Sequence, residues 1–233
     1  MNESDAIITI DGPSGSGKTT LGRLLADHLD GGMMDTGSYF RMTALLLADV
    51  DCPDDELPDV ACQKAAVVAD GFTPNLSTGI DQIGVLDRVF TDHDLRSPDA
   101  TKHLSLVASL PGVRALLLPA MRREAAQFIA SGAPLVTIGR DCGTTIWPGA
   151  TCKFFMDAPL SARERRRQEQ FPGLWDDLAR RDRADATRAA SPLRRAPDAI
   201  FLDSGGMSPE ELLETAMRHL TSMRSLAAVG IDI

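Results

Sequence analysis

Short apolar runs recur along the chain and predict the strands of a parallel sheet. Each run is too short for a stable helix and contains β-branched or aromatic residues, which favours a strand. Polar residues do not alternate with the apolar ones, as is typical of strands that are covered on both faces. The runs lie at Ala6–Ile10, Leu135–Ile138, Lys153–Met156 and Ala199–Leu202, and a shorter Met33–Met34 pair ends at Asp35.

Between these runs, apolar residues recur with a helical period. The leucines from Leu21 to Leu29 stand at i, i+3, i+4 and i+8, which predicts an amphipathic helix that ends at the Gly31-Gly32 pair. Two S-x-x-E capping boxes, Ser161–Glu164 and Ser208–Glu211, predict that further helices begin there. Other helices are predicted at Tyr39–Ala48, Val60–Ala69, Thr101–Leu110 and Val113–Ile129.

Strands that alternate with helices predict an α/β fold, in which a parallel sheet is covered by helices on both faces as a three-layer αβα sandwich. The segment from Phe72 to Pro98 departs from this pattern. Gly, Pro, Asn, Ser and Thr separate short β-prone pieces there, such as Ile83–Leu86 and Arg88–Thr91. We therefore expect a small inserted β region between the helices.

Composition and net charge limit the kinds of molecule that the protein is expected to bind. The net charge of −9 and the sequence pI of about 4.9 argue against a nucleic-acid or anionic-membrane surface, although local arginine clusters leave room for a small anionic ligand. No apolar run approaches the roughly 20 residues of a membrane span, and the first residues lack the features of a signal peptide. The four cysteines form no CxxC pair, so we expect buried free thiols in a cytoplasmic protein rather than a disulfide or a zinc site.

The segment Gly12–Thr19 fits the phosphate-binding pattern G-x-x-x-x-G-K-[ST] and stands between a predicted strand and a predicted helix. In this context, backbone amides and the helix N-terminus cradle a polyphosphate. Lys18 is expected to reach the β- and γ-phosphates and Thr19 to bind Mg²⁺. The alternative is a glycine-rich turn without a ligand. The predicted nucleotide-binding residues are Gly12, Pro13, Ser14, Gly15, Ser16, Gly17, Lys18, Thr19 and Thr20.

Arginines and carboxylates gather where the predicted strands end. The segments Asp35–Arg41 and Gly139–Thr144 each follow a strand, so they should line one crevice at the carboxyl edge of the sheet. Arg180–Arg188 is a basic helical segment that could close over it as a lid. Positive charge beside a triphosphate loop suits phosphoryl transfer. Alternatively, Arg41 and the lid segment are solvated, and Arg140 and Asp141 form a local ion pair.

Several of these stretches, taken together, resemble the bacterial cytidylate kinases, the (d)CMP kinase branch of the nucleoside monophosphate kinases. The resemblance is carried by IDGPSGSGKTT, MDTGSYFR, SLVASLPGVRALLL, GRDCGTTIWPGA, RRDRADATRAASPL and AIFLDSGGMSPEEL, in this order. It implies transfer of the γ-phosphate of ATP to CMP or dCMP with Mg²⁺, by a monomer that uses neither nucleic acid nor a membrane. It also implies one kinase domain, with a core at 1–59 and 99–233, an acceptor-binding insert at about 60–98 and a short arginine-rich lid at about 165–190.

The resemblance also implies roles for residues outside the phosphate-binding loop. Asp141 would accept a hydrogen bond from the cytosine N4 amine, and Arg114 would donate to the ring acceptors. Such pairing rejects uracil, whose O4 would face the Asp141 carboxylate. The implied acceptor-binding residues are Thr36, Arg41, Ser105, Arg114, Arg140, Asp141, Asp185 and Arg188, and the implied catalytic residues are Lys18, Arg140, Arg181 and Arg188.

Three departures from the family pattern leave alternatives open. Thr19 stands where the family usually has a second glycine, the lid segment is short, and Phe72–Arg96 matches poorly. A related kinase could therefore act on a modified pyrimidine nucleotide or on another phosphorylated small acceptor. A nucleotide-binding switch without kinase activity is the remaining alternative.

Overall fold

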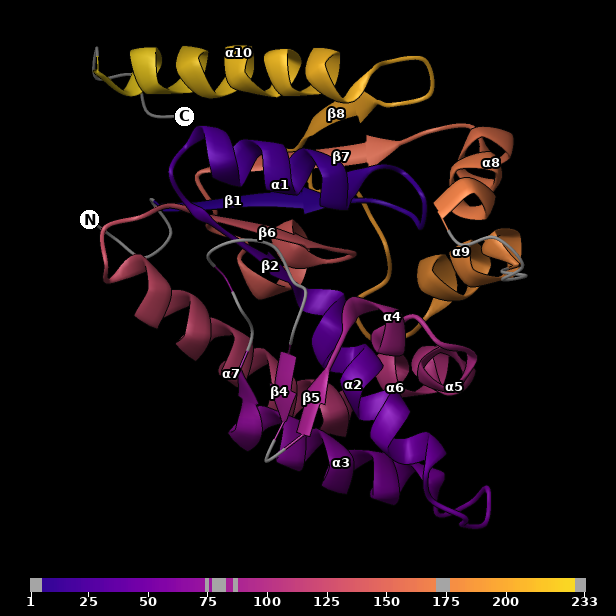
Figure 1. The fold of residues 1–233 in the computed structure, drawn as a ribbon. Coiled ribbons are helices and arrows are strands. Elements are labelled where there is room, and N and C mark those ends of the chain that lie inside the picture. The colour runs from indigo at the N-terminus through magenta and orange to yellow at the C-terminus, as the bar shows by residue number, and fades with distance from the viewer. Residues whose placement is uncertain (1–5, 74–75, 77–82, 86–87, 171–176, 229–233) are drawn as a thin grey trace.

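The fold is organised around a five-stranded parallel sheet (Figure 1). The computed structural model describes residues 6–73, 76, 83–85, 88–170 and 177–228. The strands follow the order β2-β6-β1-β7-β8. They are β1 (Ile7–Asp11), β2 (Gly32–Asp35), β6 (Leu135–Gly139), β7 (Cys152–Asp157) and β8 (Ile200–Asp203). The predicted strands are confirmed, including the short one that ends at Asp35.

The strand register brings distant segments to one edge of the sheet. Asp11 at the end of β1 is aligned with Gly139 at the end of β6, and Asp35 at the end of β2 is aligned with Ile138. Every residue of β1, β2 and β6 is buried, because helices cover both faces. The segments that leave these strands therefore start side by side at the carboxyl edge, as expected for a parallel sheet.

Helices form the two outer layers, which confirms the predicted α/β class. Figure 1 shows α1 and α10 on one face of the sheet, and α2, α3 and α7 on the other. The helices are α1 (Lys18–His28), α2 (Thr36–Ala48), α3 (Leu57–Gly71), α4 (Asp92–Leu95), α5 (Pro98–Lys102), α6 (Leu104–Ser109), α7 (Pro111–Ile129), α8 (Leu160–Gln170), α9 (Leu178–Thr187) and α10 (Pro209–Ala228), with one π-helical turn, η2 (Cys142–Ile146). None of the described helices is both long and apolar enough to cross a membrane.

Local sequence explains several helix boundaries. The Ser208 and Glu211 side chains exchange hydrogen bonds with each other's backbone amides, which forms the predicted capping box at the start of α10. Helix α1 ends through Asp30, which adopts a left-handed φ of 50°, and the Gly31 amide then donates to the Ala26 carbonyl at 2.8 Å. The predicted Thr101–Leu110 helix is wrong in detail, since the chain forms α5 and α6 there. Pro111 is the first residue of α7, because proline is tolerated in the first helical turn.

The inserted β region consists of a small antiparallel sheet packed beside α3. Its strands are β3 (Phe72–Thr73), β4 (Ile83–Val85) and β5 (Arg88–Phe90), and β4 lies in the middle. Phe72 attaches this sheet to the core, since its ring centroid lies 4.2 Å from that of the fully buried Tyr39. The β character predicted for the insert is confirmed at β3, β4 and β5, whereas the end of the same segment forms the short helix α4 (Asp92–Leu95). Its acceptor-binding role remains a prediction.

Candidate active site

The residues Gly12 to Gly17 form a tight loop between β1 and α1, and Lys18 and Thr19 are the first residues of α1, as the motif predicts. Gly17 precedes the first helical residue with a φ of 92°, a conformation that glycine adopts without strain. At Gly12, a Cβ atom would lie 2.0 Å from the Met156 carbonyl oxygen. Only glycine therefore lets this loop lie against β7, with the N-terminus of α1 opening toward a ligand.

Lys18 is held inside the loop. Its Nζ donates hydrogen bonds to the Pro13 carbonyl at 2.6 Å and to Ser16 Oγ at 3.4 Å. Burial, together with the charge of Arg140, lowers the Lys18 pKa well below its ordinary value. The phosphate oxygens of a nucleotide would supply the negative charge that stabilises the ammonium form.

A cleft of about 600 Å³ runs from this loop along the carboxyl edge of the sheet. It brings together most of the predicted site residues from the loop, α2, α6, the end of β6 and α9. Those that line it are Ser14, Gly15, Gly17, Lys18, Thr19, Thr20, Thr36, Arg41, Ser105, Arg140, Asp141, Arg181, Asp185 and Arg188. Gly12, Pro13, Ser16 and Arg114 are buried next to it and do not line it.

Opposite charges alternate along the acceptor side of the cleft. Arg114 donates a short hydrogen bond to one oxygen of the Asp141 carboxylate, and Arg188 donates to the other at 3.4 Å. Arg188 also lies 3.8 Å from Asp185, which accepts a hydrogen bond from Arg140 at 2.8 Å. The alternative of a local Arg140–Asp141 pair is wrong, because Arg140 pairs with Asp185 on α9 instead. The network joins α7, β6 and α9.

Burial and ion pairing shift the pKa values of these carboxylates and arginines in opposite directions. Burial raises the pKa of Asp185, but Arg140 and Arg188 together bring it below its ordinary value. Burial lowers the pKa of Arg188, and Asp141 and Asp185 only partly oppose this change. For Arg41, burial lowers the pKa to about 10, with Asp35 acting in the opposite direction. The buried cations at this end would be stabilised further by an anionic ligand.

Three further residues contribute on this side: Arg96 lies outside the segments predicted to line the crevice, and Asp35 and Phe40 lie inside Asp35–Arg41 but were assigned no individual role. Asp35 caps α2 by accepting from the Gly37 amide at 2.8 Å, and its other oxygen lies 3.2 Å from Arg41 and 4.0 Å from Arg96. The Phe40 ring packs under Arg114, with the guanidinium carbon 5.3 Å from its centroid. The strand-end position of Asp35 was a usable signal. No local pattern identified Arg96 or the contact of Phe40 with Arg114, because tertiary packing creates both.

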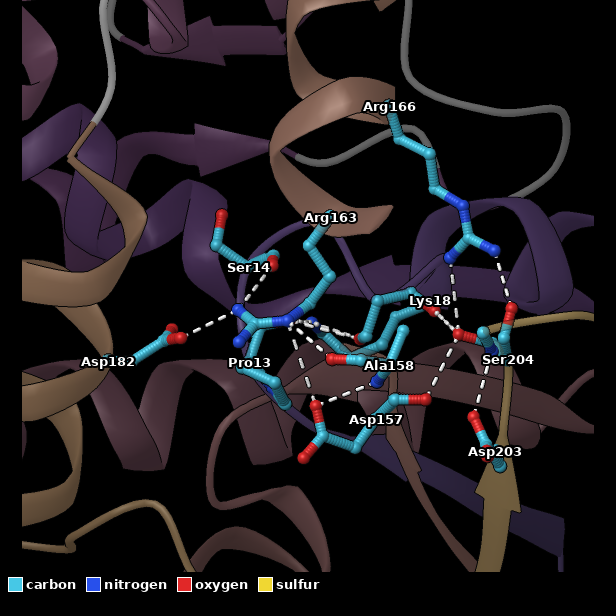
Figure 2. A network of polar contacts seen from close by, with 12 residues as sticks. Pro13, Ser14, Lys18, Asp157, Ala158, Arg163, Arg166, Asp182, Asp203 and Ser204 are labelled. Atoms are coloured by element: carbon cyan, nitrogen blue, oxygen red, sulfur yellow. Dashed lines mark hydrogen bonds and ion pairs between the residues drawn. The ribbon is translucent and has the colours of Figure 1, made fainter. Parts of the chain in front are cut away.

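Sequence reasoning also missed the arginines that join α8 to the phosphate-binding loop (Figure 2). Arg163 donates to the Ser14 carbonyl at 3.1 Å and to Asp182 of α9 at 2.6 Å. Arg166 donates to Ser204 Oγ at 3.2 Å, and this hydroxyl donates to the Ser16 carbonyl at 2.8 Å. Two turns of α8 thus connect the loop with α9 and with the end of β8. The i, i+3 spacing of the two arginines places them on one face of the helix, and this pattern could have identified them from the sequence.

Known proteins identify the family to which this arrangement belongs. The profile of one family, described as cytidylate kinase, matches residues 8–222. This chain belongs to the cytidylate kinase family. It is therefore a nucleoside monophosphate kinase, and the family match argues against the alternative of a non-catalytic switch.

Relatives named cytidylate kinase are similar over nearly the full length of the chain. The protein from Vibrio cholerae serotype O1 is 34% identical over 235 residues, which cover 95% of this chain and 99% of the relative. Those from Rhodococcus jostii and Mycolicibacterium paratuberculosis are 34% and 35% identical, covering 91% and 97% of this chain and 93% and 99% of the relatives. As the family implies, this cytidylate kinase homologue uses ATP, which fits its phosphate-binding loop.

Proposed function

We propose that the chain transfers the γ-phosphoryl group of ATP to CMP or dCMP, in the cleft between the phosphate-binding loop and Asp141. The observation that carries this proposal is the position of the Asp141 carboxylate. It is buried, it is held by arginines from α7 and α9, and it lines the same cleft as Lys18. A phosphate donor and a base-reading carboxylate then share one continuous site.

The donor half of the site would bind the triphosphate through Gly12–Thr20. The amides at the start of α1 and the Lys18 ammonium would face the phosphates. Thr19 lines the cleft with a hydroxyl that suits Mg²⁺, a hard cation with a preference for oxygen ligands. The described residues contain no cluster of acidic, His or Cys ligands for a metal, so the triphosphate oxygens would complete the coordination of Mg²⁺. Bound there, Mg²⁺ would neutralise charge on the transferring phosphates.

The acceptor half would read cytosine at the buried end of the cleft. Asp141 would accept from the N4 amine, and Ser105 would face the ring acceptors. Arg114, which is buried next to the cleft and bound to Asp141, would donate to the ring acceptors once a base is bound. Uracil presents an acceptor, O4, in place of this amine, and an acceptor that faces a carboxylate is disfavoured. Asp185 would contact the sugar hydroxyls. Thr36, whose hydroxyl donates to the Ile138 carbonyl at 3.0 Å, would lie beside the acceptor phosphate.

Catalysis would come from charge neutralisation and positioning. An oxygen of the acceptor phosphate attacks the γ-phosphorus, the bond from this phosphorus to the β–γ bridging oxygen breaks, and ADP leaves with the electron pair. Arg41, Arg140, Arg181 and Arg188 would neutralise the phosphates during this step, with Lys18 on the donor side. A general base is not needed, because the second pKa of a phosphate monoester is about 6.

The proposal divides the chain by role. The core spans 1–59 and 99–233, the acceptor-binding insert about 60–98, and the lid about 165–190, of which residues 171–176 lie outside the described part of the chain. The lid prediction is supported by Arg166 and Arg167 of α8, Arg181 of α9 and Arg188 directly after α9, which all line the cleft. We further propose that the enzyme acts as a monomer in the cytoplasm, without nucleic-acid or membrane partners.

An ADP-release assay with ATP and Mg²⁺ tests the function directly. The acceptors are CMP, dCMP, UMP and AMP, with a reaction without acceptor as background. We expect strong turnover with CMP or dCMP and little with UMP or AMP. Weak turnover with all four acceptors, in protein that binds ATP, would contradict the proposed acceptor and favour a modified pyrimidine nucleotide or another phosphorylated acceptor.

A further inference from the structure

The turn that follows Asp141 is capped in an unusual way. Asp141 precedes the π-helical turn η2 and occupies its N-cap position. The first amides of a helical turn lack partners within the turn, and an N-cap aspartate ordinarily accepts from them. Here the Asp141 side chain makes no such hydrogen bond, because its two oxygens bind Arg114 and Arg188.

A residue from another strand replaces this missing cap. Asp11, the last residue of β1, accepts from the Cys142 amide at 2.8 Å with one oxygen and from the Gly143 amide at 2.7 Å with the other. These are the first two amides of η2. The pairing crosses the sheet from β1 to the end of its neighbour β6, where Asp11 is aligned with Gly139. One carboxylate thus satisfies two backbone donors that Asp141 leaves unpaired.

We infer that Asp11 is a positioning residue for acceptor recognition: it caps η2 in place of Asp141 and thereby leaves the Asp141 carboxylate directed at the acceptor base. The inference rests on the proposed function of Asp141 as the cytosine reader. Without the Asp11 carboxylate, the Gly143 amide, which is the second amide of η2, would be satisfied most easily by Asp141 itself, which would turn its oxygens away from Arg114 and from the base.

The surroundings of Asp11 fit this indirect role. Its side chain is buried and does not line the cleft, so it acts through the residues that it holds. Within the described part of the chain, no lysine or arginine forms an ion pair with it. Its stabilising partners are backbone amides, and Asp141, Cys142 and Lys18 are its titratable neighbours.

Asp11 also links the two halves of the site. It directly precedes Gly12, the first residue of the phosphate-binding loop, while its side chain holds the turn that directly follows Asp141. The contact therefore keeps the base-reading carboxylate in register with the strand that leads into the donor loop. Because the loop keeps its own hydrogen bonds at Lys18 and Ser16, loss of the Asp11 carboxylate should affect the acceptor first.

The test compares Asp11→Ala and Asp11→Asn with the parent enzyme. For Asp11→Ala we expect the KM for CMP to rise about five- to thirtyfold, which is the effect of removing a capping side chain, and the preference for CMP over UMP to fall by a similar factor. The KM for ATP should stay within about twofold. Asp11→Asn should be intermediate, since its amide oxygen can accept from one of the two amides and its NH₂ group cannot accept from the other.

Thr9→Val is the matched control. Thr9 is a buried residue two positions earlier on the same strand, and its hydroxyl lies near the same turn without a hydrogen-bond partner. This variant should keep the parent KM for CMP and the parent CMP to UMP ratio. Thermal melts of all variants show whether each is folded. If Asp11→Ala does not fold, the same comparison is made with Asp11→Asn.

Two outcomes would overturn the inference. Equal increases in the KM for ATP and for CMP, with an unchanged CMP to UMP ratio, would show that Asp11 supports the fold or the donor loop in general. Parent-like constants in Asp11→Ala would show that Asp141 needs no external cap. The parent enzyme reports separately on the proposed function, because an absence of CMP preference would appear in the parent before any substitution.

Discussion

The two halves of the cleft are built on different principles. The donor half is a single short segment, Gly12–Thr20, in which backbone amides, glycine conformations and one lysine form the binding surface. The acceptor half is assembled from side chains of α2, α6, α7, β6 and α9, which are distant in sequence. The first depends on local backbone geometry, and the second depends on ion pairs between separate elements.

This difference matches what each half of the cleft has to recognise. A triphosphate carries the same charge pattern in every nucleotide, so a backbone cradle with a positive helix end suffices for it. A pyrimidine base is distinguished by the order of its donors and acceptors, which requires side chains held at defined positions. The Arg114–Asp141–Arg188 cluster provides such positions, because each group is buried and paired. Substitutions on the two sides should therefore separate donor binding from acceptor use.

The largest expected effect comes from the arginine shared by catalysis and the acceptor side. Arg188→Ala should lower kcat by about 10³-fold, the scale of an arginine that stabilises phosphoryl transfer, with the Kd for ATP changed only a few fold. Steady-state kinetics and a direct ATP titration measure the two quantities. Arg180→Ala on the same helix is the control, because that side chain is 74% exposed and should tolerate the change. A parallel loss of ATP affinity would assign Arg188 to the donor half instead.

The next effect tests base reading alone. Asp141→Asn should lower kcat/KM for CMP by about 10²-fold or more, because an amide cannot match both Arg114 and the N4 amine. Activity with UMP should fall less or rise, since the NH₂ group can donate to O4. Competition assays with CMP and UMP in one mixture give the ratio directly. If both substrates behave as they do with the parent enzyme, Asp141 does not read the base.

A smaller effect should appear where the two halves are joined. Arg163 binds both the Ser14 carbonyl and Asp182, so Arg163→Lys and Asp182→Asn should each lower kcat by about tenfold or less. The double variant should lose less than the two single losses combined, with a coupling of about 1 kcal/mol, since both substitutions break one ion pair. Strict additivity would show that the loop and α9 are not connected through this pair.

The smallest effect concerns the pH dependence of stability. Burial raises the pKa of Asp11 to about 6 despite its hydrogen bonds from Gly143 and Cys142. A raised pKa means that the folded state binds a proton more readily than the unfolded state, so the folded state is favoured as the pH falls through 6. Between about pH 7 and about pH 5, the parent should gain about 1 kcal/mol in the free energy of unfolding relative to Asp11→Asn. Urea unfolding at several pH values measures this difference, and a constant difference would contradict the raised pKa.

Much of the fold could be predicted from local patterns. The apolar runs located β1, β6, β7 and β8, and the capping box at Ser208 located the start of α10. These features depend on residues close in sequence, so periodicity and capping reveal them. The helix at Thr101–Leu110 was wrong because the chain interrupts it at His103, where α5 ends and α6 begins. That interruption has no local breaker such as proline or glycine.

The candidate site also contains some features that the sequence predicts and others that it does not. The sequence by itself determined the phosphate-binding loop, since its glycines, lysine and threonine act within a few residues of one another. It also determined which residue types stand at the ends of the strands. Only the tertiary structure decided that Arg140 pairs with Asp185, that Arg96 reaches Asp35 and that Asp11 caps the turn after Asp141. These partners lie far apart in sequence, and they meet because the strands adopt the order β2-β6-β1-β7-β8, which no local pattern of side chains encodes.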